Sequence, residues 1–209
     1  MPIDWMYPYL TPAGVIMKLN RQPLASIPED ILQRDHKFWK QYARRLCGDI
    51  VDYDTSVKDL TDRLHKIYVR RDFEGFTGDR KFVHDIDAQK AFSKLRSAIA
   101  GVYTWRLGPQ CPVEYRPKSP TEFQRLLQEA DFSYRQAFAF CPWSPEAAFH
   151  YVNLLLQSGR LEDALLVTRM YLKLDPFSAQ GLGVMSYLQG LKQQQVTQTT
   201  GVALAPAGH

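Results

Sequence analysis

Two aspartate triplets are the residues of this chain whose spacing first suggests chemistry. Asp52-Tyr53-Asp54 and Asp85-Ile86-Asp87 each place two carboxylates one residue apart. Enzymes that use nucleotide sugars hold a divalent cation with this spacing, provided that further oxygen ligands converge on the ion. Each triplet also precedes a predicted helix, where aspartate caps the first turn and interacts favourably with the helix dipole. We interpret both triplets as helix caps and keep a metal site as the alternative.

The histidines and cysteines show no spacing that is typical of a catalytic or metal site. The chain has five histidines, none of them in a His-Glu-x-x-His pattern, and three cysteines that stand far apart. No glycine-rich phosphate loop follows a predicted strand. We therefore expect no catalytic residue, no bound metal and no cofactor.

Basic residues cluster between residues 37 and 45 and between residues 66 and 71, with aromatic residues among them. A nucleic-acid surface can be built in this way. However, 26 lysines and arginines face 22 acidic residues, which leaves a net charge of only +4. We expect no nucleic-acid partner, and we interpret these residues as solvated helix faces or as a surface that faces lipid headgroups.

The acidic and basic residues named above must be positioned by secondary structure. Hydrophobic periodicity predicts helices along most of the chain. Possible capping boxes begin at Ser26 and Ser119, and prolines between residues 109 and 120 predict a connector. The predicted organisation is an irregular aromatic segment with one short hairpin at 1–25, an N-terminal helical portion at 26–108, a helical array at 119–194 and a disordered tail at 195–209.

The array repeats itself with a period of 34 residues. Ala130 and Ala164 are 34 positions apart, as are Pro142 and Pro176. A small residue lets two helices approach closely, and a proline ends the second helix of each pair. With Gly159 at the turn between two helices, this pattern resembles the tetratricopeptide repeat.

The repeat is divergent, because Val152, Thr168 and Tyr171 replace residues that are usual in the motif. Prolines also occupy the place of the first helix of the earlier unit, and we expect the helix at 87–107 to substitute for it. The fold class that follows is all-α: a short tetratricopeptide-like α-solenoid with the N-terminal helical portion packed on it. The segment Gln180 to Gln193 is expected to cover the last unit.

The resemblance implies a concave groove that holds a peptide. Asn153 matches the asparagine that such repeats use to grip a peptide backbone, whereas Phe149 stands where capture of a chain terminus needs lysine. An extended or helical peptide is therefore the expected ligand, and filling of the groove by the chain's own N-terminal segment is the alternative. The predicted groove residues are Glu146, Phe149, Asn153, Leu156, Gln157 and Tyr187.

A second resemblance extends over residues 3 to 175. The segments Asp4 to Leu10, Gly14 to Asn20, Tyr68 to Phe73 and Ala88 to Ser97 are similar to the soluble C-terminal region of bacterial polytopic membrane proteins that resemble protein O-mannosyltransferases of the GT-C superfamily. The resemblance implies a membrane-associated location on the extracytoplasmic side and an upstream membrane domain as partner. A chain that stands alone is instead expected to be soluble and cytoplasmic.

These observations predict a non-catalytic module for protein interaction or assembly, in the setting of a membrane glycosyltransferase-like protein. The catalytic acidic residue of that superfamily has no counterpart in this chain, so no catalytic residue is carried over. The competing hypothesis is a glycosyltransferase domain that binds a sugar nucleotide or a polyprenyl sugar through one of the Asp-x-Asp triplets.

Overall fold

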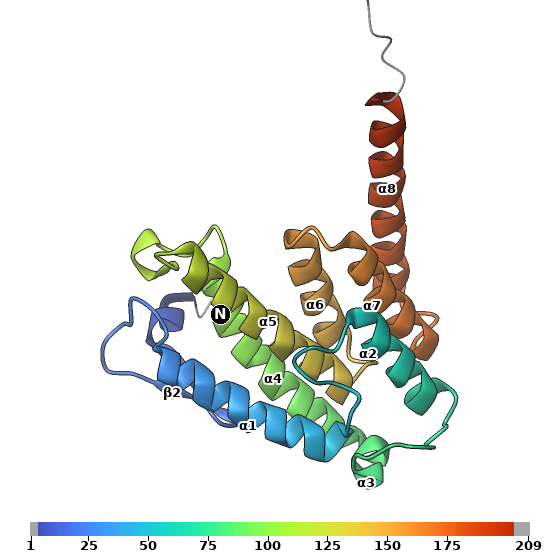
Figure 1. Ribbon diagram of the computed structural model, residues 1–209, viewed down its shortest axis with the longest axis horizontal. Coiled ribbons are helices and arrows are strands. Elements are labelled where there is room, and N and C mark those ends of the chain that lie inside the picture. Colours follow the sequence, from blue (N-terminus) through green and yellow to red (C-terminus); the bar gives the residue numbers. More distant parts are fainter. Residues whose placement is uncertain (1–3, 203–209) are drawn as a thin grey trace, which may run out of the picture.

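The computed structural model describes residues 4–202 and is mostly helical, with eight α-helices and one small hairpin in this range. The prediction of an all-α chain is confirmed at this level (Figure 1). The α-helices are α1 (Glu29–Cys47), α2 (Val57–Leu64), α3 (Arg80–His84), α4 (Ile86–Leu107), α5 (Pro120–Phe140), α6 (Pro145–Gln157), α7 (Leu161–Leu174) and α8 (Ala179–Val202).

Shorter elements complete the chain. A 3-10 helix, η1 (Asp4–Tyr9), leads into an antiparallel hairpin of β1 (Leu10–Ala13) and β2 (Ile16–Leu19). This is the short hairpin expected within residues 1–25. The π-helix η2 (His65–Val69) continues α2, and the 3-10 helix η3 (Val113–Tyr115) lies in the connector between α4 and α5.

Side-chain caps set the start of most of these helices. Asp85 Oδ1 accepts a hydrogen bond from the Ala88 backbone N–H at 2.9 Å, and Ser119 accepts one from Glu122. The predicted cap at Ser26 is wrong, because α1 begins at Glu29 after Pro28 and has no side-chain cap. Pro28 itself supplies the extended backbone that precedes the first turn.

The helices from α4 onward pack on their neighbours in sequence. Helix α4 lies antiparallel to α5, with Ser93 Oγ donating to the Ala137 carbonyl at 2.8 Å. Helix α6 packs on α5 and α7, and α8 packs on α7. Since α4 belongs to the predicted portion 26–108 and α5 to the portion 119–194, these two ranges share one hydrophobic core.

Helix α8 extends away from the rest of the molecule (Figure 1). It continues to Val202, so the predicted disordered tail begins too early at residue 195. Residues 203–209 of that predicted tail lie outside the described residues. Within residues 4–202, no helix combines the length and the apolar character that a membrane span requires.

Two glycines on α8 are expected to respond in opposite directions to alanine. A Cβ on Gly181 would lie 2.8 Å from Leu172 Cδ2 and 2.9 Å from Tyr171 Cε1, whereas a Cβ on Gly183 would meet no atom within 4 Å. Gly181→Ala should therefore lower the free energy of unfolding by about 1–2 kcal/mol through overpacking. Gly183→Ala should raise it by about 0.5–1 kcal/mol, because alanine favours the helix. Urea denaturation of both variants tests this, and shifts of the same sign would contradict the packing of α8 on α7.

Candidate functional site

The interpretation of the aspartate triplets as helix caps is confirmed for Asp85 and wrong for Asp52 and Asp54, because Ser56 caps α2. Asp52 Oδ1 lies 3.0 Å from Lys40 Nζ and accepts a hydrogen bond from the Tyr53 backbone N–H at 2.7 Å. Partial burial favours the neutral acid, but these two partners outweigh it and lower the pKa of Asp52. Asp85 caps α4. Across the described part of the chain, no group of three or more His, Cys, Asp or Glu residues is placed to hold a metal ion.

The cysteines are buried and stay protonated at neutral pH. Burial raises the pKa of the Cys141 thiol to about 12 and raises the pKa of Cys47 further. Burial also raises the pKa of Cys111. Because the thiolate is the nucleophilic form, none of the three thiols is activated for nucleophilic chemistry.

The predicted groove residues fall into different environments. Glu146, Asn153 and Gln157 are exposed on one stripe of α6, and Leu156 is half-buried beside them. Tyr187 is 60% exposed on α8. Gln157 also lines a cavity between α5 and α6, and it is the one predicted groove residue that does so.

Phe149 does not face a groove, which corrects the prediction for this residue. Its side chain is 8% exposed, and its ring lies edge-on to Tyr171 of α7 with centroids 5.0 Å apart. Helix α6 contacts α4, α5 and α7, so that most of its circumference is covered. The 34-residue spacing by itself does not predict that α6 has a third neighbouring helix.

The N-terminal segment lies against α4. The Tyr7 ring stacks on Trp105 with centroids 5.3 Å apart and an interplanar angle of 14°. Gly101 of α4 lies beside it, since a Cβ there would be 3.9 Å from the Tyr7 hydroxyl. The segment therefore packs on α4 and does not fill the predicted groove, because Glu146, Asn153 and Gln157 of α6 stay exposed.

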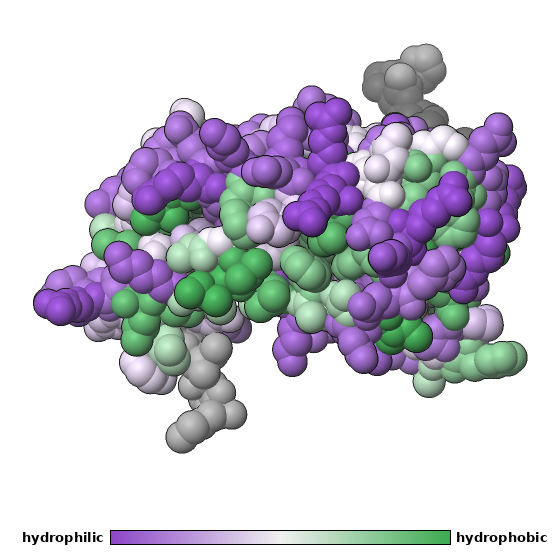
Figure 2. Space-filling model, turned by 90° about the horizontal axis from the view of Figure 1, so that it is seen from below, coloured by the Kyte–Doolittle hydropathy of each residue, from purple (hydrophilic) through white to green (hydrophobic). Residues whose placement is uncertain are grey.

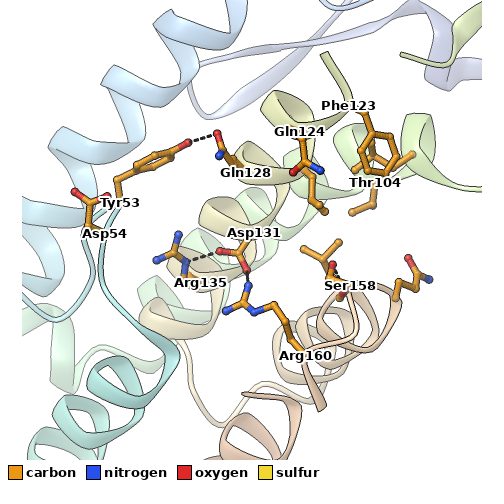
Figure 3. Close-up of a pocket in the computed structure, with 14 residues that line it drawn as sticks. Tyr53, Asp54, Thr104, Phe123, Gln124, Gln128, Asp131, Arg135, Ser158 and Arg160 are labelled. Carbon is orange, nitrogen blue, oxygen red and sulfur yellow. Dashed lines mark hydrogen bonds and ion pairs between the residues drawn. The ribbon is translucent and has the colours of Figure 1, made fainter. Parts of the chain in front are cut away.

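A cavity between α5 and α6 has a volume of about 700 Å³ (Figure 3). We call it the α5–α6 cavity. The loop between α1 and α2 closes one end with Tyr53 and Asp54, and the end of α4 contributes Thr104. Its apolar lining comes from Leu107, Phe123, Leu127 and Leu154.

A closed ion-pair cluster forms the floor of the cavity. Asp131 Oδ2 lies 2.8 Å from Arg135 Nε, and Asp131 Oδ1 lies 2.8 Å from Arg160 Nη1. The Tyr151 hydroxyl also donates to Asp131 at 3.2 Å, and burial, reinforced by this carboxylate, keeps the pKa of Tyr151 well above its usual value. Arg160 pairs in addition with Asp163 at 2.7 Å. The charges of this floor are thus neutralised within the protein.

Carboxamide side chains provide the polar lining above this floor. Gln128 accepts a hydrogen bond from the Tyr53 hydroxyl at 3.3 Å, which leaves its N–H donors available. Within residues 4–202, the side chains of Gln124 and Gln157 have no hydrogen-bond partner, and both residues are exposed at the mouth of the cavity. Amides that line a cavity without partners can donate to and accept from a ligand.

The sequence contained a signal for this site on α5 that periodicity could have found. Gln124, Gln128, Asp131 and Arg135 lie three or four residues apart and form one polar stripe on a helix that is otherwise largely buried. A polar stripe on a buried helix indicates either a polar interface or an open cavity. Only the position of α6 decides between a polar interface and an open cavity.

No protein-family model matches this chain, no curated protein is significantly similar to it, and no solved structure shares a significant similarity with its fold. The functional interpretation therefore depends on the geometry of the α5–α6 cavity and on its surroundings.

Proposed function

We propose that this chain is a non-catalytic interaction module that binds an extended peptide segment of a partner protein in the α5–α6 cavity. The observation that carries the proposal is the lining of this cavity: free carboxamides of Gln124 and Gln157 stand above apolar side chains. A peptide in extended form offers both backbone amides and apolar side chains to such a surface.

A short tetratricopeptide-like arrangement of α4 to α8 is part of the proposal. It is supported by the burial of Ala130 and Ala164, which are both 0% exposed, on α5 and α7. It is further supported by the ends of these two helices, because Pro142 and Pro176 follow them within two residues. In this arrangement α4 and α5 form one helix pair, α6 and α7 form the next, and α8 covers the last.

A membrane setting on the extracytoplasmic side, with a membrane domain of a glycosyltransferase-like protein as neighbour, also remains a proposal. It is supported by exposed apolar residues of β2, where Ile16 is 63% and Leu19 is 56% exposed. Figure 2 shows apolar side chains gathered near the middle of the face seen from below, with hydrophilic side chains around them. Such a face favours contact with another protein surface.

Selection from a phage-displayed library of random peptides tests the peptide-binding function. We expect selected peptides to bind the whole chain in calorimetry and to lose at least about tenfold in affinity with Gln157→Trp, since the bulky indole would replace a carboxamide of the lining and obstruct part of the cavity. Gln189→Trp, at an exposed position of α8, is the matched control and should leave the affinity unchanged. If no peptide is enriched, or if selected peptides bind the Gln157→Trp variant equally well, the proposed function is wrong.

A further inference from the structure

A second cavity lies where the ends of η2, α3 and α7 meet the start of α4, and it has a volume of about 330 Å³. We call it the α3–α4 cavity. It shares no lining residue with the α5–α6 cavity, so the two are separate sites. Its volume falls at the lower end of the range that small-molecule sites occupy.

Apolar side chains form one part of the lining of the α3–α4 cavity. They come from the end of α3, the start of α4, the loop between α5 and α6 and the end of α7, and they are Val83, Ile86, Trp143 and Leu174. Val83 is buried, whereas Ile86 is 56% exposed. An apolar group that enters the cavity would remove part of the Ile86 side chain from water, which favours binding.

Gln89 holds the Trp143 ring in this lining. Its Oε1 accepts a hydrogen bond from Trp143 Nε1 at 3.0 Å, and its Nε2 donates to the carbonyls of Phe82 at 3.0 Å and Val83 at 2.7 Å. Lys90 Nζ lies 5.0 Å from the centroid of the Trp143 ring. The aromatic part of the lining is therefore fixed before a ligand binds, which lowers the entropic cost of binding.

Arg71 brings an unpaired positive charge to the α3–α4 cavity. Within residues 4–202, its side chain has no ion-pair or hydrogen-bond partner, and the lining of the cavity contains no acidic residue. Burial raises the pKa of the Tyr68 phenol, and the charge of Arg71 opposes this rise, which is consistent with a guanidinium near the Tyr68 side chain in the same lining. The cavity therefore favours an anion.

The backbone conformation of Arg71 gives an independent reason to assign a role to its side chain. Its φ is 57°, and among the described residues no other residue except glycine has a positive φ. The Asp72 N–H donates to the Lys66 carbonyl at 3.1 Å and closes the end of η2 around this position. Glycine usually stands at such a helix end, because a Cβ costs energy in the left-handed region. A strained residue that lines a cavity indicates a function for its side chain.

From these observations we propose that the α3–α4 cavity binds a small organic monoanion, namely a carboxylate joined to an aromatic or branched aliphatic group. Arg71 would hold the carboxylate through two parallel N–H···O hydrogen bonds, and the apolar group would lie against Trp143 and Leu174. A single arginine balances one negative charge, which favours a carboxylate over a phosphate dianion. This site goes beyond the proposed function and does not depend on it.

Calorimetric titration of the whole chain with 4-phenylbutyrate tests the inference. We expect a Kd of about 0.05 to 1 mM, as befits a ligand with few non-hydrogen atoms. Two matched compounds separate the contributions of charge and apolar area. The neutral 4-phenylbutyramide lacks the charge and acetate lacks the apolar group, and each should bind at least about tenfold more weakly.

Two glycine variants separate the role of Arg71 in binding from its role in folding. Arg71→Gly should weaken 4-phenylbutyrate binding at least about tenfold and should keep or raise the Tm, since glycine adopts a positive φ without strain. Arg70→Gly is the matched control, because Arg70 is exposed, has a right-handed helical backbone and does not line the cavity. It should lower the Tm and leave the affinity within about twofold.

Ile86→Glu provides a second measurement at the opposite part of the lining. Ile86 is the first residue of α4, where glutamate is compatible with the helix, so the variant should fold. Its carboxylate would repel the ligand and should weaken binding at least about fivefold.

Three outcomes would overturn the inference. These are the absence of saturable binding at about 10 mM 4-phenylbutyrate, equal binding of 4-phenylbutyramide, and full affinity in Arg71→Gly. Loss of binding in Gln157→Trp would place the ligand in the α5–α6 cavity and would overturn the assignment as well. Failure of the peptide selection contradicts only the proposed function, because the two cavities share no lining residue.

Discussion

Replacing Asp35 with alanine is expected to lower the free energy of unfolding by about 3–5 kcal/mol, because it leaves a buried guanidinium without its counter-ion. Arg96 of α4 and Asp35 of α1 have fully buried side chains, and Arg96 Nη1 lies 2.8 Å from Asp35 Oδ2. The Tyr103 hydroxyl donates to the same oxygen at 2.7 Å. Loss of the carboxylate would therefore leave two buried donors, Arg96 Nη1 and the Tyr103 hydroxyl, without their acceptor.

Urea denaturation followed by circular dichroism measures this effect. The double variant Asp35→Leu/Arg96→Met should lose much less stability than Asp35→Ala, because replacing both charges removes the desolvation cost together with the attraction. Asp30→Ala is the matched control: it breaks a pair on the same helix, Asp30–Arg34, whose side chains are 70% and 73% exposed, and should change stability little. A loss below about 1 kcal/mol for Asp35→Ala would contradict a buried charge at this position.

Arg106→Met is expected to release the N-terminal segment from the helical body and to lower the free energy of unfolding by about 3 kcal/mol. Arg106 is 1% exposed, and its guanidinium donates to backbone carbonyls of Leu24 at 3.1 Å, Ala25 at 3.2 Å and Tyr115 at 3.2 Å. Burial lowers the pKa of this arginine, but arginine stays charged at neutral pH. Methionine fills a similar volume and donates to none of these carbonyls.

Hydrogen exchange measured by mass spectrometry localises the effect. Backbone amides in residues 4–25 should lose protection in Arg106→Met, while those of α6 and α7 keep it. Arg116→Met is the control, since Arg116 donates to Cys111 and Pro109 carbonyls within the connector and should leave residues 4–25 protected. Unchanged exchange of residues 4–25 in Arg106→Met would show that other contacts hold this segment.

The predicted helices follow from local signals, which explains where prediction succeeded. Ser119 with Pro120 places a cap and a first-turn proline at the start of α5. Ser26 shows the limit of such a signal. Its side chain has the right type, but the residues after it are not helical until Glu29, and a cap must stand directly before the first turn.

The buried polar residues could not be predicted from the sequence as a network. Asp35, Arg96 and Gln136 lie on three different helices, and each residue type is normally expected at the surface. Periodicity places Asp35 on α1 but does not state which arginine it meets. The same holds for Asp131, whose partners Arg135 and Arg160 come from its own helix and from the start of α7.

By itself, the sequence determined that the chain is helical, that a hairpin precedes the helices and that small residues recur every 34 positions, because these properties depend on neighbours within about one helical turn or on simple spacing. Only the tertiary structure decided which helix faces stay open. Phe149 became buried and Gln157 became part of a cavity because α6 meets three other helices. The exposure of a side chain depends on what packs around it, and those neighbours come from residues as far apart as Tyr53 and Arg160.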